Sequence, residues 1–200
     1  MDAGELLLVQ HAAVHGVAVR GRGRPSLADR VFGSVADGQM RQRPAAGGNS
    51  LAWLLWHVAR AEDVFVNTVL WSRPQVFADG WATKLNVARP DIGTGMTADE
   101  VAALSDAVDL AALRDYRDAV GRRTREGVSA MPAGAWEGRV EAADLRRAEE
   151  AGAFGPNASE LPAFFTGWPR ATLLSSIAVI HTSQHIGEAI TVRGLLGLGQ

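Results

Sequence analysis

The sequence of 200 residues contains no cysteine, one tyrosine and a single lysine, Lys84. Without cysteine the chain forms no disulfide bond and has no thiol nucleophile. Any thiol that takes part in its chemistry must therefore come from another molecule. The other basic residues are all arginine, and this bias, together with the many alanines and glycines, indicates a GC-rich genome rather than a function.

Long hydrophobic runs and an excess of charge are also missing. No apolar stretch approaches the roughly 20 residues that span a bilayer. The acidic start, Met-Asp-Ala-Gly-Glu, lacks the basic region of a signal peptide. The 20 basic and 22 acidic residues give a net charge of −2, which provides no long-range attraction to nucleic acid or to an anionic membrane. We therefore expect a cytoplasmic protein with no nucleic-acid or membrane partner.

Apolar residues recur with helical spacing in four long segments, residues 4–19, 51–71, 109–130 and 170–196. Hydrophobic residues make up 47% of the chain, which is enough for a substantial core. No alternating segment of useful length predicts a strand, and no hairpin signal is present. The sequence therefore predicts an all-α fold, a four-helix bundle with short accessory helices, in a single domain over residues 1–200.

Capping signals mark where three of the predicted helices begin. Ser26 precedes a short apolar helix, and Asn49 or Ser50 precedes the clearest helix of the chain. Thr97 with Glu100 three residues later forms a capping-box pattern.

Residues 76–96 lie between two of these helical segments and are interrupted by irregularly spaced glycine and proline. They show little periodicity, so we predict a long loop. A loop of that length inside a compact domain is often functional.

Two histidines stand four residues apart in the C-terminal stretch IHTSQHIGE, at His181 and His185. On a helix this spacing places both side chains on one face, at the separation needed to bind one divalent ion. The pattern alone is also compatible with partly buried histidines bonded to the backbone or to Glu188. His57 lies in the middle of an apolar stripe on another helix, so it faces inward and needs a partner: either a hydrogen bond or a metal shared with this pair.

A second pair with the same spacing, His11 and His15, competes for the same role. Spacing cannot separate the two pairs. His11 lies on an apolar stripe, whereas His15 adjoins a glycine- and arginine-rich segment that ends the helix. We therefore favour the C-terminal pair as the metal ligands.

Three segments, GGNSLAWLLWHVARAED, GTGMTADEV and HTSQHIGEAITVRGLLG, resemble the DinB-like (DinB/YfiT) four-helix-bundle superfamily of metalloenzymes. The resemblance spreads over residues 26–196. It implies an up-down-down-up order of the four helices, with residues 76–96 as the long crossover. It also implies that His57, His181 and His185 bind a divalent metal, zinc or nickel.

Three histidines leave coordination positions open, as in catalytic rather than structural sites. Several relatives in this superfamily use a low-molecular-weight thiol, so the resemblance implies an S-transferase of the mycothiol or bacillithiol type acting on a small-molecule substrate. It also implies a homodimer, which the abundance of tryptophan supports. The alternative from another class is a non-catalytic metal-binding protein of stress response or interaction, in which the ion only ties two helices together. A bundle of this family without metal is a third reading.

Four polar residues near the histidines are candidates to support the ligands. Glu188 follows His185 on the same face and is placed to accept its second ring N–H. Gln184, Glu62 and Asp63 are the other three. For Glu62 and Asp63 the competing expectation is a solvated helix edge paired with Arg60.

Overall fold

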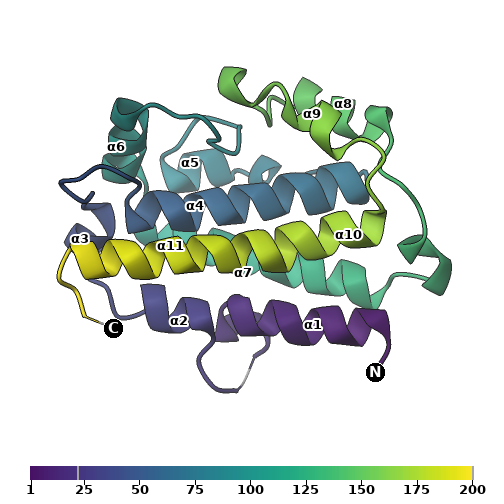
Figure 1. The fold of residues 1–200 in the computed structure, drawn as a ribbon, viewed down its shortest axis with the longest axis horizontal. Coiled ribbons are helices and arrows are strands. Elements are labelled where there is room, and N and C mark those ends of the chain that lie inside the picture. Colours follow the sequence, from purple (N-terminus) through teal and green to yellow (C-terminus); the bar gives the residue numbers. More distant parts are fainter. Residues whose placement is uncertain (22, 200) are drawn as a thin grey trace.

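The computed structural model describes residues 1–21 and 23–199, and within these residues the fold is helical throughout, with no strand (Figure 1). An isolated bridge between Arg139 and Pro169 is the single β-type pairing among them. The all-α fold expected from the sequence is therefore confirmed. None of the described helices is both long and apolar enough to cross a membrane.

The α-helices are α1 (Ala3–Val14), α2 (Leu27–Phe32), α3 (Asp37–Arg41), α4 (Leu51–Glu62), α5 (Trp81–Leu85), α6 (Ala98–Ala107), α7 (Leu110–Ser129), α8 (Ala142–Glu150), α9 (Leu161–Phe165), α10 (Arg170–Ser175) and α11 (Thr182–Leu195). Two π-helical segments are η2 (Asp63–Leu70) and η6 (Ser176–His181). The 3-10 turns are η1 (Val17–Val19), η3 (Val76–Ala78), η4 (Ala133–Trp136) and η5 (Pro156–Ala158).

Within residues 1–21 and 23–199 the longest helical rods are α1, α4 with η2, α7, and α10 with η6 and α11, because the π segments join α-helices end to end. α4 continues directly into η2, and α10, η6 and α11 follow one another without a break. α4 packs against both α7 and α11, and α1 packs against α7 and η6 (Figure 1). The end of η2, the end of α7 and the beginning of α10 meet around one pocket at the same end of the bundle.

The predicted caps are present in the structure. The Ser50 hydroxyl accepts the Trp53 N–H at 3.0 Å, so Ser50 and not Asn49 begins α4. Capping boxes begin α2 at Ser26 and α6 at Thr97. Each of these side chains satisfies a backbone N–H that the first turn of a helix leaves free.

Two boundaries differ from the sequence-based expectation. The first helix ends at Val14 instead of residue 19, because His15 adopts an extended conformation and Gly16 leads into a separate 3-10 turn. Residues 76–96 are not a continuous loop but contain η3 and α5. These elements are too short to show helical periodicity, so the sequence pattern missed them.

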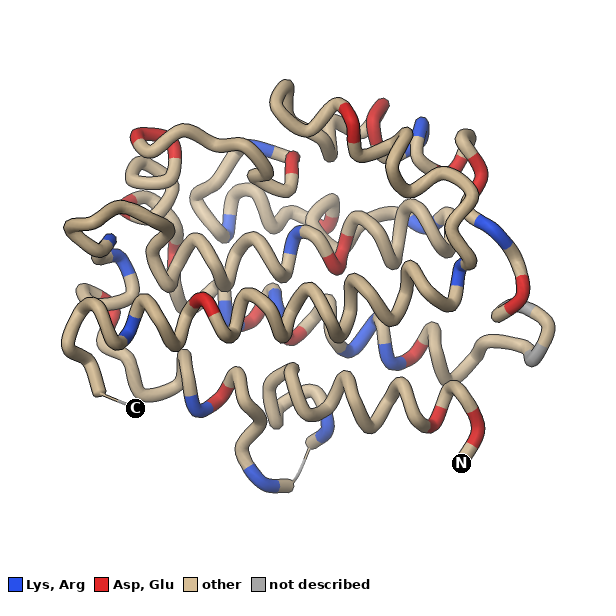
Figure 2. Tube along the Cα trace, viewed as in Figure 1, with Lys and Arg blue, Asp and Glu red and all other residues tan. Residues whose placement is uncertain are grey.

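α4 is buried on all sides, and α7 turns one stripe toward it. Helical spacing in residues 109–130 puts five residues on one stripe of α7, and all of them are buried: Leu110, Leu113, Tyr116, Val120 and Thr124. Charged residues of both signs are scattered along loops and helices, the central helices included (Figure 2). The core is therefore built around α4, and the polar side chains of α4 must find their hydrogen-bond partners within the protein.

Asp63 corrects one expectation, since it is fully buried and not part of a solvated edge. Its carboxylate accepts hydrogen bonds from the Tyr116 hydroxyl at 2.6 Å and from the Val76 and Phe77 N–H groups, both at 2.9 Å. Arg60 lies 3.3 Å from the same carboxylate. Asp63 therefore holds the beginning of η3 against the centre of the bundle.

The contact between Gly127 of α7 and Trp71 gives a test of this packing. A Cβ atom at Gly127 would overlap the Trp71 ring, so Gly127→Ala should lower the free energy of unfolding by roughly 1–3 kcal/mol. The matched control is Gly187→Ala in α11, where no atom lies within 4 Å of the added Cβ. This control should be neutral or stabilising by up to about 1 kcal/mol, since alanine favours a helix over glycine. Urea unfolding of both variants measures the difference, and equal stabilities would refute the packing.

Candidate metal centre

The structure brings His57, His181 and His185 together, and one ligand atom from each lies within 4.8 Å of the others. The Nε2 atoms of His57 and His181 are 3.1 Å apart. The ring of His185 has its centre 4.7 Å from that of His57 and 4.5 Å from that of His181. Three imidazoles from two neighbouring helical rods thus converge on one point.

His57 is held from the middle of α4 by contacts on two sides of its ring. The Trp53 indole stacks on it at 4.7 Å with an interplanar angle of 9°. Its Nδ1–H donates to the Ile92 carbonyl at 2.5 Å. The Ile92 N–H in turn donates to the Ala153 carbonyl at 3.0 Å, and this bond helps to hold Ile92 in place beside His57.

His185 is oriented by a carboxylate and an amide. Its Nδ1–H donates to Glu188 Oε2 at 2.8 Å, and the other oxygen, Oε1, accepts from Asn49 Nδ2 at 2.8 Å. Glu188 therefore lies where the sequence placed it, next to His185. The sequence indicates Asn49 only as a possible helix cap. Its hydrogen bond to Glu188 joins residues 139 positions apart in the chain.

These hydrogen bonds select the ring tautomers. A neutral imidazole that donates from Nδ1 carries no proton on Nε2, so His57 and His185 present free Nε2 lone pairs toward the centre. Metal-binding histidines commonly donate their second N–H to a carbonyl or carboxylate in this way. The 3.1 Å between the Nε2 atoms of His57 and His181 also suits one ion at roughly 2.0–2.1 Å from each. The residues present therefore fit a divalent ion.

Burial keeps two of the rings neutral. Desolvation, and then the nearby His185, lower the pKa of His57 from 6.5 to about 4. Desolvation, and then His57 and His185, lower the pKa of His181 to about 3. The hydrogen bond from His185 also lowers the pKa of Glu188, which favours the carboxylate that orients the ring. Neutral imidazoles are the form that binds metal.

The last ligand-bearing rod contains a feature that the sequence did not predict. His181 is the final residue of the π-helical segment η6, and His185 lies one turn into α11. A π segment adds a residue to a helical turn and is often found at functional sites. The Nδ1 atom of His181 is buried without a hydrogen-bond partner among the described residues.

The other proposed supporting residues lie elsewhere. Gln184 is exposed, and Asp63 is engaged by Tyr116 and the backbone of η3. Glu62 is buried, with its carboxylate 3.0 Å from His11 Nε2 and 3.8 Å from His15 Nε2. The expectation that these three residues support the histidines is therefore corrected: Glu62 and Asp63 bond to other groups, and Gln184 is exposed.

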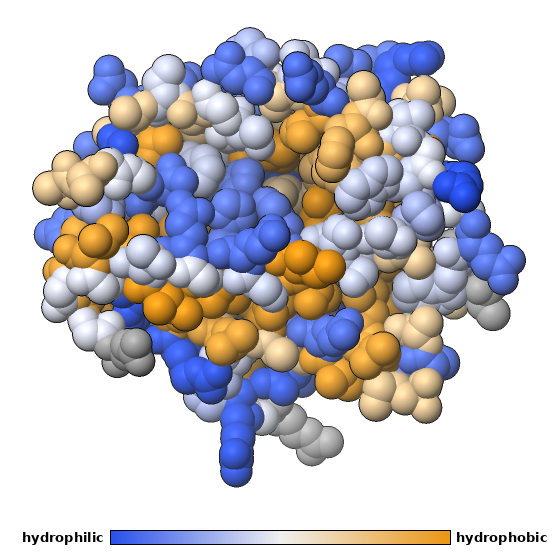
Figure 3. Space-filling model, viewed as in Figure 1, coloured by the Kyte–Doolittle hydropathy of each residue, from blue (hydrophilic) through white to orange (hydrophobic). Residues whose placement is uncertain are grey.

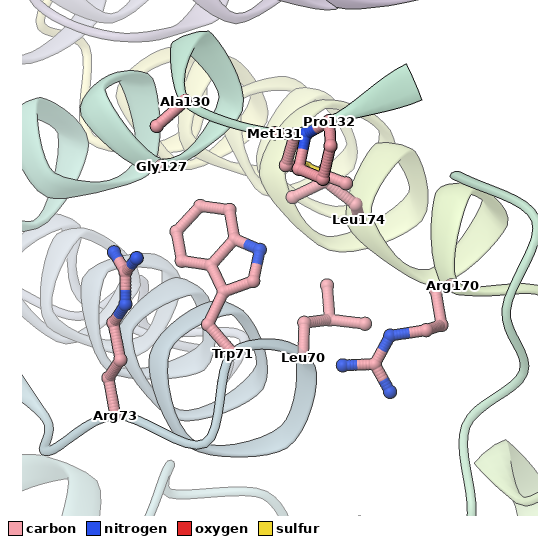
Figure 4. Close-up of a pocket in the computed structure, with 9 residues that line it drawn as sticks. All are labelled: Leu70, Trp71, Arg73, Gly127, Ala130, Met131, Pro132, Arg170 and Leu174. Carbon is pink, nitrogen blue, oxygen red and sulfur yellow. The ribbon is translucent and has the colours of Figure 1, made fainter. Parts of the chain in front are cut away.

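The surface offers two settings for a ligand. Hydrophilic residues gather at the middle of the face shown in Figure 3, around a hollow above α11. A separate pocket of about 210 Å³ at the end of the bundle contains none of the three histidines. Figure 4 shows that pocket, in which Trp71 and Leu70 lie between Arg73 and Arg170.

The fold and the histidine cluster together define a helical-bundle protein with a candidate metal centre. The chain belongs to the DinB superfamily, which matches residues 22–189. No curated protein matches the chain. A solved structure, the conserved protein of locus from Enterococcus faecalis, is similar with a TM-score of 0.68 and 18% identity, over 98% of this chain and 97% of that one. At this identity the likeness shows a shared fold.

The lowered pKa values predict how the metal-free protein responds to acid. At a pH between the folded and unfolded pKa values of His57, the unfolded state binds more protons than the folded state. The contribution of the neutral His57 ring to the free energy of unfolding is therefore fully present above pH 6.5 and is lost as the pH falls toward 4. From pH 7 to pH 5, His57 alone should remove about 2 kcal/mol from the free energy of unfolding. Denaturant unfolding in EDTA measures this loss. In His57→Gln the loss of unfolding free energy between pH 7 and pH 5 should be smaller by that amount. A loss equal to that of the wild-type protein would contradict the account.

Proposed function

We propose that the chain binds one divalent ion, zinc or nickel, through the Nε2 atoms of His57, His181 and His185. The observation that supports this most strongly is the pair of hydrogen bonds behind the rings, from His57 to the Ile92 carbonyl and from His185 to Glu188. Both leave the second ring nitrogen free to bind an ion, as metal-binding histidines do when they donate their other N–H to a carbonyl or carboxylate.

We further propose that this site belongs to a thiol-dependent S-transferase of the mycothiol or bacillithiol type, acting on a small-molecule substrate. A divalent ion with open coordination positions lowers the pKa of a thiol or water that reaches it. The thiol has to come from a cosubstrate, because the chain has no cysteine.

The chain's own residues supply orientation and exclusion of water. Trp53 and the Ile92 carbonyl fix the His57 ring, while Asn49 holds Glu188 against His185. His57 is buried, whereas His181 and His185 are half-buried and give the cluster a side that faces solvent. A substrate would approach from that side.

The competing reading is a metal-binding stress-response or interaction protein without turnover. The same three histidines would then only tie α4 to the last helical rod. Thiol binding tests the first reading, because a thiol-dependent transferase must bind its thiol, whereas the second reading does not require it.

Three further inferences accompany this proposal. We infer that the four rods follow the up-down-down-up order, with residues 76–96 as part of the crossover; the meeting of the ends of η2 and α7 with the start of α10 supports this order. We infer a cytoplasmic location, as expected from the sequence. We also infer a homodimer, since Leu6, Val9 and Ile190 are exposed hydrophobic residues. Hydrophobic side chains also gather along the lower half of the face in Figure 3.

Removal of one ligand tests the metal proposal. His57→Ala should raise the dissociation constant of this site for Zn²⁺ at least tenfold, because one of three protein ligands is lost. Gln184→Ala is the matched control, since Gln184 is exposed on the same helix as His185 and should leave binding unchanged. Calorimetric titration of metal-free protein measures both constants, and equal affinities would refute the ligand assignment.

The cobalt-substituted protein tests the thiol step. Mycothiol or bacillithiol should add a sulfur-to-cobalt absorption band in the near ultraviolet that His57→Ala lacks. If neither thiol changes the spectrum of the loaded protein, the non-catalytic reading holds.

A further inference from the structure

A second cluster of potential metal ligands lies on the opposite side of α4 from the three histidines. His11, at the end of α1, and His15, its C-cap residue, approach Glu62 at the end of α4. All three side chains are at most 3% exposed. The sequence pointed to the two histidines, and only the fold brings a carboxylate to them.

The Glu62 carboxylate is buried, and the ring nitrogens within 4.0 Å of it belong to His11 and His15, which are cationic only when protonated. Among the described residues no arginine or lysine nitrogen comes within 4.0 Å of it. Arg117 lies near enough to interact electrostatically with Glu62, but Arg117 donates to the Val14 carbonyl at 3.0 Å and also faces Asp29 and Asp118. A buried carboxylate is costly unless a positive charge or a metal compensates it.

The spacing of the three groups suits a shared ion. His11 Nε2 is 3.0 Å from Glu62 Oε1, and His15 Nε2 is 3.8 Å from Oε2. The second distance is too long for a hydrogen bond, yet it suits two atoms that each lie about 2.0–2.2 Å from one ion. His15 Nε2 and His11 Nδ1 are both buried without a hydrogen-bond partner among the described residues. Two imidazoles and a carboxylate are also an established ligand set for zinc.

We propose that His11, His15 and Glu62 bind a second divalent cation, which ties α1 to α4. Both oxygens of Glu62 face the cluster, so the carboxylate can supply two donors and complete four-coordination without an open position. Such a closed site is structural in character. It does not depend on the proposed function of the other site.

One contact must change when this ion binds. The Gly16 N–H donates to His15 Nδ1 at 2.9 Å. A neutral ring that binds metal through Nε2 carries its proton on Nδ1, so this amide has to turn away. The peptide precedes a glycine in the loop after α1, where rotation meets little steric resistance. The Gly16 amide is therefore a direct reporter of the second site.

Metal stoichiometry separates the two sites. Metal-free protein is incubated with excess Zn²⁺, desalted, and its zinc is counted by mass spectrometry. The wild-type protein should retain two ions per chain, His11→Gln one, His57→Gln one, and the double variant none. Glutamine keeps a polar side chain that can still hydrogen-bond to Glu62.

The possible results are distinguishable. One ion in wild type and one in His11→Gln, with none in His57→Gln, would overturn the second site and leave the first. One ion in wild type and one in His57→Gln, with none in His11→Gln, would support the second site and overturn the first. No ion in wild type would overturn both.

A measurement on wild type keeps the test valid if His11→Gln fails to fold. In protein labelled with ¹⁵N-glycine, Zn²⁺ should shift the Gly16 amide resonance, and the shift should persist in His57→Gln. Glu62→Gln, which preserves the size of the side chain, should weaken zinc binding at this site at least tenfold. A Gly16 resonance that does not respond to Zn²⁺ in wild type would overturn the proposal.

Discussion

The packing of α4 against α11 and η6 is the constraint on which the rest of the structure depends. It buries His57 opposite His181 and His185, at a distance where protonated rings would repel one another. Burial favours the neutral form of His57 and His181, and a neutral ring in this cluster has one N–H that needs an acceptor. The Ile92 carbonyl and Glu188 meet that need for two of them. The Ile92 segment and the Asn49–Glu188 contact can therefore be understood as consequences of placing imidazoles inside a helical bundle.

Local sequence signals predicted the elements that depend on local interactions. Ser26 and Thr97 begin helices as expected, and the stripe from Leu110 to Thr124 is buried, because caps and helical periodicity arise from residues three or four positions apart. The inward positions of the three histidines followed from the same periodicity. The family resemblance, and not spacing, joined His57 to the C-terminal pair.

Contacts between distant segments could not be predicted in the same way. Asn49 reaches Glu188 across 139 residues, and Glu62 reaches His11 across 51. The pattern indicates an exposed edge at Glu62 and Asp63 because neighbouring charges usually are exposed, but the end of α1 covers Glu62, and α7 and η3 cover Asp63. The π segments were also missed, since a single added residue per turn leaves no compositional signal. The two HxxxH pairs thus have the same spacing but different surroundings: one is backed by hydrogen-bond acceptors, the other faces a carboxylate.

The central claim is that the Nε2 atoms of His57, His181 and His185 hold one divalent ion. The most direct measurement is anomalous X-ray diffraction, above and below the absorption edge of zinc, from crystals of untagged protein grown with Zn²⁺. The account predicts an anomalous peak about 2.0–2.1 Å from all three Nε2 atoms, with His57 Nδ1 still bonded to Ile92. A well-ordered histidine cluster that shows no peak, while protein in the same crystals is saturated with zinc elsewhere, would contradict it.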